Sequence, residues 1–112
     1  MTHLSFSGNL YRAANHVLEH TTLGRELPRV ATVHDDGKRL NIELRPYAAD
    51  ALSTGEGHLL NYLTSLSGAG DVNMWRLIQR VDPDSAVAVA WSIGIAAGKF
   101  EEYTPVSFGG GA

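Results

Sequence analysis

The most regular hydrophobic pattern in the chain alternates large and very small residues over 86–98, read as AVAVAWSIGIAAG. The large residues recur at every second position, and alanine, serine or glycine lies between them: Val87, Val89, Trp91, Ile93 and Ile95. A period of two with β-branched and aromatic residues favours a β-strand. Because neither side carries charge, we expect a central strand with the core on its large side. A helix or a second copy of the chain would pack closely on its small side.

Three further stretches predict strands that form two hairpins. Residues 30–34 and 39–45 flank the turn sequence DDGK, in which Gly37 can supply the positive φ that such turns need. Residues 72–81 are predicted as a third strand. The turn DPDS at 82–85 would join this strand directly to the one over 86–98.

Apolar residues at helical spacing predict two helices. The first runs from about Gly8 to about Thr21, with Ser7 as its capping residue. Its apolar stripe consists of Leu10, Ala13, Ala14, Val17 and Leu18. The second begins after Thr54 and buries four leucines, Leu59, Leu60, Leu63 and Leu66. Residues 47–53 can form a short helical turn between the first hairpin and this helix.

The predicted element order is α-β-β-α-β-β, with hairpins in place of alternating βα units. This order favours an α+β fold in which two helices cover a four-stranded antiparallel sheet made of two hairpins. The chain has 112 residues, and 44% of them are hydrophobic, which suits a single domain. We expect that domain to span 1–104 and a flexible C-terminal tail to span 105–112.

Composition narrows the classes of function. The chain contains no cysteine, which excludes disulfides and cysteine-based zinc sites. A net charge of −3 gives no electrostatic footprint for nucleic acid, which is not expected as a partner. The apolar run at 86–98 is too short to cross a bilayer, so no membrane association is expected either. The first residues lack the pattern of a secretory leader, and we expect a cytoplasmic protein.

One motif could carry chemistry, the H-x-x-E-H pattern of His16, Glu19 and His20 on the first predicted helix. Histidines four residues apart project to the same side and can share a zinc ion, and the glutamate can polarise a water. The stretch HVLEHTTLG at 16–24 resembles the metal-binding helix of pitrilysin-type (inverzincin) metallopeptidases. The resemblance implies His16 and His20 as zinc ligands and Glu19 as the catalytic base. Alternatively, the three side chains lie on the solvent side of an amphipathic helix, which is the interpretation we favour.

Arginines and apolar residues on the predicted strands suggest a binding face. Two arginines lie on one side of the strand over 39–45, and two more lie on one side of the strand over 72–81. Guanidinium groups suit phosphates or carboxylates. A methionine and an isoleucine share the side of the second pair, and Met and Arg are enriched in protein interfaces. The candidate binding residues are Arg39, Arg45, Met74, Arg76, Ile78 and Arg80.

These patterns favour a non-enzymatic module that binds another macromolecule, as a regulator, adaptor or inhibitor. We expect it to pair with itself through the sheet face, to bind another protein as well, and to need no cofactor. A small zinc-dependent hydrolase built on the His16 motif is the first alternative. The second alternative is a small-ligand domain with a pocket between the second helix and the sheet, near Tyr62, Trp75 and Trp91.

Overall fold

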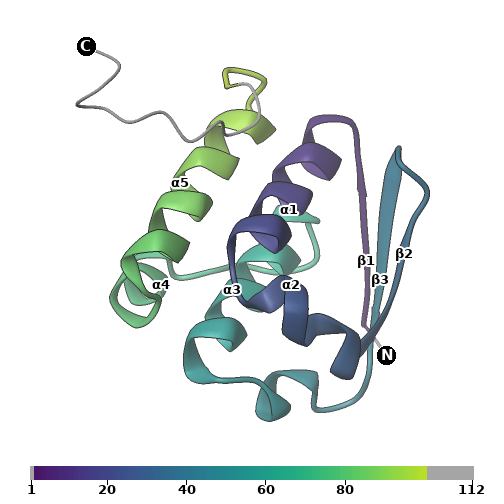
Figure 1. Ribbon diagram of the computed structural model, residues 1–112, viewed down its shortest axis with the longest axis vertical. Coiled ribbons are helices and arrows are strands. Elements are labelled where there is room, and N and C mark those ends of the chain that lie inside the picture. The colour runs from purple at the N-terminus through teal and green to yellow at the C-terminus, as the bar shows by residue number, and fades with distance from the viewer. Residues whose placement is uncertain (1, 101–112) are drawn as a thin grey trace.

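The computed structural model describes residues 2–100, which fold into a three-stranded sheet and a set of helices (Figure 1). In chain order, the elements are β1 (Thr2–Ser7), α1 (Gly8–His20), α2 (Leu23–Glu26), the 3-10 turn η1 (Leu27–Arg29), β2 (Ala31–Asp35), β3 (Arg39–Leu44), the 3-10 turn η2 (Ala48–Ala51), α3 (Thr54–Leu66), α4 (Met74–Arg80) and α5 (Pro83–Ala96). The predicted tail at 105–112 lies outside the described residues.

The sheet is antiparallel and has the strand order β1-β3-β2. The predicted hairpin is confirmed as β2 and β3, and its turn is held by the Asp36 carboxylate, which accepts the backbone N–H groups of Lys38 and Arg39. The third strand is β1, the short segment before the first helix, which pairs with β3 and not with a strand from the C-terminal half. The prediction of a four-stranded sheet made of two hairpins is therefore wrong.

The segment predicted as the central strand, 86–98, is instead mostly helix α5. The residues just before the alternating pattern carry two helix-start signals, a capping side chain and a proline. The Asp82 side chain accepts the Ser85 backbone N–H, and Pro83 occupies the first turn, where its missing N–H costs nothing. Its buried positions follow helical spacing and are mostly small: Ser85, Ala88, Val89, Ser92 and Ile95.

The predicted strand over 72–81 is also wrong, because its residues 74–80 form helix α4. Asn73 caps this helix by accepting the backbone N–H of Arg76. Leu77 is the buried residue of α4, and the helix packs against α3. With both C-terminal strands replaced by helices, the second predicted hairpin does not exist.

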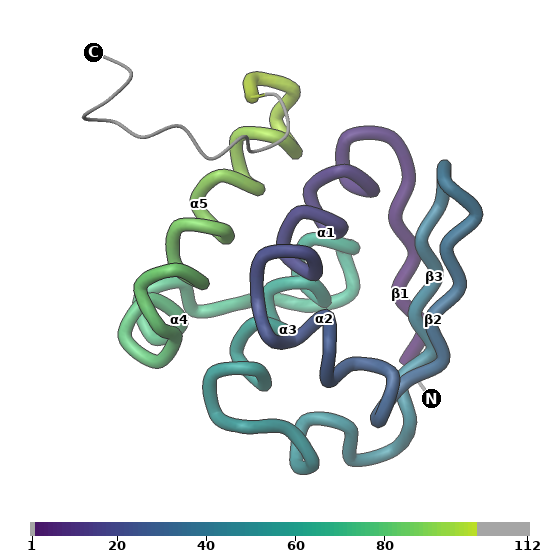
Figure 2. The backbone as a smooth tube through the Cα atoms, in the orientation of Figure 1, coloured from purple at the N-terminus to yellow at the C-terminus, as the bar shows by residue number. Residues whose placement is uncertain are grey.

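Helix α1 lies between the sheet on one side and α5 on the other (Figures 1 and 2). Its buried residues Ala13, Ala14 and Val17 belong to the predicted stripe, and His16 is buried as well. Tyr11 ties α1 to the sheet by donating its hydroxyl to Asp35 at 2.8 Å. This bond to a carboxylate raises the pKa of Tyr11 above its usual value. The small buried residues of α5 suit close packing against a neighbouring helix such as α1.

The main core lies between the inner face of the sheet and helices α1 and α3. It includes Leu4 and Phe6 from β1, Leu40 and Ile42 from β3, and Leu59, Leu60 and Leu63 from α3. These leucines of α3 were predicted to be buried, and the fourth, Leu66, packs against the core while partly exposed. The outer face of the sheet carries polar side chains, among them His3, Ser5, Thr32, His34 and Glu43.

The two predicted helix starts differ in their capping. Helix α3 begins at Thr54, one residue earlier than predicted, and its cap is Ser53, which forms a reciprocal capping box with Glu56. Helix α1 begins directly after Ser7, and the Ser7 side chain makes no capping hydrogen bond. The boundary of α1 was therefore predicted correctly, while the proposed capping bond was not.

Between α1 and α2 the chain turns so tightly that Gly24 lies against the end of α1. A Cβ atom added to Gly24 would stand 1.9 Å from the carbonyl oxygen of Leu18. Since this oxygen belongs to backbone, it cannot rotate away as a side chain would.

Candidate functional site

The histidine motif lies on α1, where the rings of His16 and His20 have centroids 4.4 Å apart at an interplanar angle of 40°. His16 is only 4% exposed, so the prediction that it faces solvent is wrong, whereas Glu19 and His20 are exposed. Within residues 2–100 no group of three or more potential ligands is placed to hold a metal ion. A catalytic zinc needs three protein ligands, and the described residues do not fit such a site.

The four arginines of the predicted binding face occupy two separate regions. Arg39 begins β3, Arg45 follows its last residue, and Arg76 and Arg80 lie on α4. Figure 1 shows α4 on the side of the molecule away from the sheet, so the four guanidinium groups do not converge on a sheet face. Arg45 instead donates from Nη1 to the backbone oxygen of Arg29 at 2.8 Å.

The C-terminal helices expose several large apolar side chains. Trp75 and Ile78, on one side of α4, are 68% and 51% exposed, and Val87 and Ile93 of α5 are 54% and 48% exposed. We call these four residues the α4–α5 apolar surface. Sequence reasoning singled out Ile78 but placed it on a strand with Met74, which is half-buried against the core. Helical spacing from the Asp82-Pro83 start would have separated Val87 and Ile93 from the buried positions.

The three aromatic residues predicted near one ligand pocket, Tyr62, Trp75 and Trp91, lie in three different surroundings. Tyr62 is buried, with its hydroxyl 2.7 Å from Oγ of Ser92. Burial raises the pKa of Tyr62, and the bond to Ser92 partly offsets the rise. The ring of Trp91 lies 4.7 Å from that of Phe100, and Trp75 points away from the core.

A depression does lie between the second predicted helix and the sheet, but other residues line it. We call it the η2 depression, because η2 forms its wall between the end of β3 and α3. Its volume is about 470 Å³ and it is open to solvent. Polar lining residues include Arg45, Asp50, Asn61 and Thr64, while Leu44 and Leu60 supply apolar surface. Tyr47 stands at this depression with its side chain 82% exposed.

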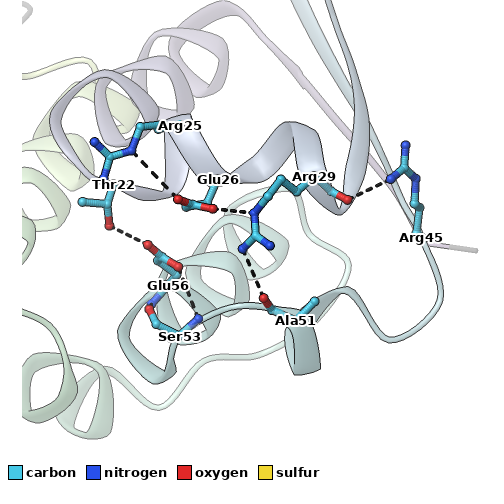
Figure 3. A network of polar contacts seen from close by, with 8 residues as sticks. All are labelled: Thr22, Arg25, Glu26, Arg29, Arg45, Ala51, Ser53 and Glu56. Atoms are coloured by element: carbon cyan, nitrogen blue, oxygen red, sulfur yellow. Dashed lines mark hydrogen bonds and ion pairs between the residues drawn. The ribbon is translucent and has the colours of Figure 1, made fainter.

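A polar network beside this depression joins α2 and η1 to the start of α3 (Figure 3). Arg29 contacts the Glu26 carboxylate at 2.5 Å and donates to the Ala51 backbone oxygen at 3.3 Å. Glu56 accepts the Thr22 hydroxyl at 2.8 Å as well as the Ser53 backbone N–H. Partial burial pushes the pKa of Glu56 upward, but these hydrogen bonds outweigh it and leave the pKa lowered. The network is paired within itself, which indicates a structural role.

The chain matches no protein-family model, no curated protein and no solved structure. Among residues 2–100, no helix is both long and apolar enough to cross a membrane. Functional inference therefore depends on the two surface features above, the α4–α5 apolar surface and the η2 depression.

Proposed function

We propose that this protein is a non-enzymatic binding module that forms a homodimer through the α4–α5 apolar surface. The observation that carries the proposal is the mismatch between the sequence of α5 and its environment. The helix has no charged residue between Ser85 and Ala96, yet within residues 2–100 the side away from its buried residues is covered only in part, where Phe100 lies against Trp91 and Gly94. Val87 and Ile93 remain about half exposed on the other side. Large apolar side chains exposed on two consecutive helices are typical of a protein interface.

Charge favours a second copy of the chain as the occupant. A two-fold axis makes the same surface meet itself, so the surface must be self-complementary. The uncharged middle of α5 can meet its own copy without placing like charges in contact. Asp82 and Asp84 lie at its N-terminal end, and Lys99 follows its C-terminal end. In an antiparallel pair, Asp84 of each helix can lie beside Lys99 of the other, and Glu101 and Glu102 follow Lys99 in the sequence.

Two of the other predicted binding residues, Arg76 and Arg80, fit the edge of such an interface. Arg76 and Arg80 are exposed on α4, on the same helix as Trp75 and Ile78. Arginine at the rim of an apolar contact stays solvated while its alkyl chain covers apolar surface. The polar outer face of the sheet lies away from α5 and is left accessible to another protein.

The test is the oligomeric state of matched variants, measured by analytical ultracentrifugation. Concentrations from about 1 μM to about 1 mM cover association free energies of about −8 to −4 kcal/mol. Val87→Asp and Ile93→Asp each place a charge in the interface and should shift the protein to monomer. Thr32→Asp is the control, because Thr32 is exposed on the outer face of β2, across α1 from α5, and the change should leave the dimer intact.

Charge reversal tests the antiparallel arrangement. Asp84→Lys and Lys99→Asp should each weaken the dimer, and the double variant should restore part of the lost affinity. A strict monomer at about 1 mM, the weak limit of this range, would contradict the homodimer. A dimer that tolerates Val87→Asp would place the interface elsewhere. A monomer that binds a different protein through α5 would retain the binding role but refute self-association.

A further inference from the structure

Tyr47 adopts a backbone conformation that disfavours a large side chain. It is the one non-glycine residue with positive φ in the part of the chain described, with φ 61° and ψ 26°. It follows Pro46 in a turn closed by the Ala48 N–H, which donates to the Arg45 oxygen at 3.2 Å. Glycine or asparagine normally occupies such a left-handed turn position, because a Cβ is crowded there.

The fold gains little from the Tyr47 ring in return for this strain. The side chain is 82% exposed and therefore contributes almost no burial to the core. Strained residues persist where the surrounding structure holds them, and they cluster at binding sites. A rigidly placed and exposed aromatic ring beside an open depression is suited to stack against a ligand.

The side chains of the η2 depression indicate the chemistry of that ligand. Among residues 2–100, the Asp50 carboxylate and the Asn61 amide make no side-chain hydrogen bond, so both remain available to a ligand. Arg45 and Asp50 carry opposite charges, and the lining therefore has no excess of either sign. The amide both donates and accepts, and the carboxylate accepts, which suits a ligand rich in hydroxyl groups. A volume of about 470 Å³ is within the range of small-ligand sites.

We propose that the η2 depression binds a neutral saccharide, with its C–H face on the Tyr47 ring and its hydroxyls on Asp50 and Asn61. This site is separate from the α4–α5 apolar surface, and its proposal does not depend on dimer formation. Val87→Asp should accordingly leave saccharide binding unchanged, so that failure of either proposal can be recognised independently.

The experiment is a titration of the full chain with cellotriose, maltotriose and triacetylchitotriose, followed by backbone chemical shifts. At least one probe should give saturable shifts concentrated at residues 44–50 and 60–64. Tyr47→Gly should weaken that binding by at least about tenfold, while its melting temperature stays the same or rises because glycine accepts positive φ without strain. Tyr47→Trp keeps a stacking ring and should retain binding.

Asn61→Ala should also weaken binding, whereas Asn9→Ala, at an exposed site on α1, is the matched control. The proposal is overturned if none of the three saccharides shifts this region, or if Tyr47→Gly binds as tightly as the parent chain. A marked drop in the melting temperature of Tyr47→Gly would assign the ring a structural role instead. Displacement of the bound saccharide by inorganic phosphate would indicate an anion site and would equally refute the proposal.

Discussion

Helices α1 and α5 pack against each other, but polar and apolar residues are distributed differently around them. Each side of α1 that carries buried residues has a partner, the sheet on one side and α5 on the other (Figure 2). Polar residues such as Arg12, Asn15 and Glu19 lie between or beyond these contacts. Helix α5 is apolar on all sides, and within residues 2–100 the side away from its small buried residues is covered only in part, by Phe100 at Trp91 and Gly94. The comparison shows that an apolar sequence identifies the buried side of a helix only where polar residues mark the other side.

The alternation of large and small residues in α5 led to a wrong prediction of a strand. Its large residues are in fact divided between buried and exposed positions. Val89 and Ile95 are buried, while Val87 and Ile93 are exposed. In a strand all four would share one face, whereas in a helix residues two apart point in directions about 160° apart. The true buried stripe is formed largely by Ser85, Ala88 and Ser92, which weigh little in any hydrophobic pattern.

The largest expected effect is on the free energy of unfolding, and it distinguishes a helix from a strand at α5. Ala88 is buried and Ala90 is exposed, although a strand would place them on the same face. Ala88→Leu should lower the free energy of unfolding by about 1–3 kcal/mol, because the extra methylene groups cannot fit the packed side. Ala90→Leu should change it by less than about 0.5 kcal/mol. Denaturant unfolding at low protein concentration measures both.

Equal losses for the two leucine variants would contradict the helical arrangement of α5. As a further control, Ala97→Leu, at an exposed position just after the helix, should behave like Ala90→Leu. This control separates a general cost of adding an apolar side chain from a cost of packing.

A smaller effect concerns the starts of α3 and α1. The Ser53 side chain accepts the backbone N–H of Glu56 at 3.2 Å, and Ser7 makes no such bond. Ser53→Ala should cost about 1 kcal/mol of stability, which is typical of a lost N-cap. Ser7→Ala should cost less than about 0.5 kcal/mol. Thermal or denaturant unfolding of both variants checks the difference, and a larger loss for Ser7→Ala would show that its hydroxyl caps α1.

The smallest effect is the response of the helix caps to acid. Hydrogen bonds from Ser85 lower the pKa of Asp82, which caps α5. A carboxyl group whose pKa is lowered on folding stabilises the fold above its unfolded pKa of about 4, and this contribution is lost as pH falls through the folded value. Hydrogen exchange should therefore show α5 opening more readily below about pH 4. Asp82→Asn keeps a capping side chain and should remove this pH dependence, whereas an unchanged dependence would assign it to another group.

The sequence predictions succeeded where a segment has clear turn or capping residues at its ends and polar residues along its exposed side. The hairpin at 31–44 was found because DDGK defines the turn and polar residues alternate with Leu40 and Ile42. Helix α1 was found because its stripe is amphipathic. Helices α4 and α5 were missed because their start signals, Asn73 and Asp82-Pro83, also occur in turns. The general α+β composition with an antiparallel sheet is confirmed, and the count and pairing of strands are not.

The candidate sites were less accessible to sequence reasoning. Exposure of Val87 and Ile93 depends on which side of α5 meets α1, which is a tertiary property. The positive φ of Tyr47 depends on the turn that closes from Ala48 to Arg45, and tyrosine is not a residue from which that conformation is expected. His16 was predicted to face solvent because α5, which packs against α1, was predicted to be a strand.

The tight approach of Gly24 to Leu18 has a practical consequence for mutational screens. Any side chain at position 24 collides with a backbone oxygen, so a library of substitutions would lose abundance there regardless of what the protein binds. A screen scored by cellular phenotype would then rank Gly24 among the most sensitive positions, next to the HVLEHTTL segment that precedes it. That sensitivity could be mistaken for evidence of a metal-binding motif, although its cause is the close approach of α2 to the end of α1.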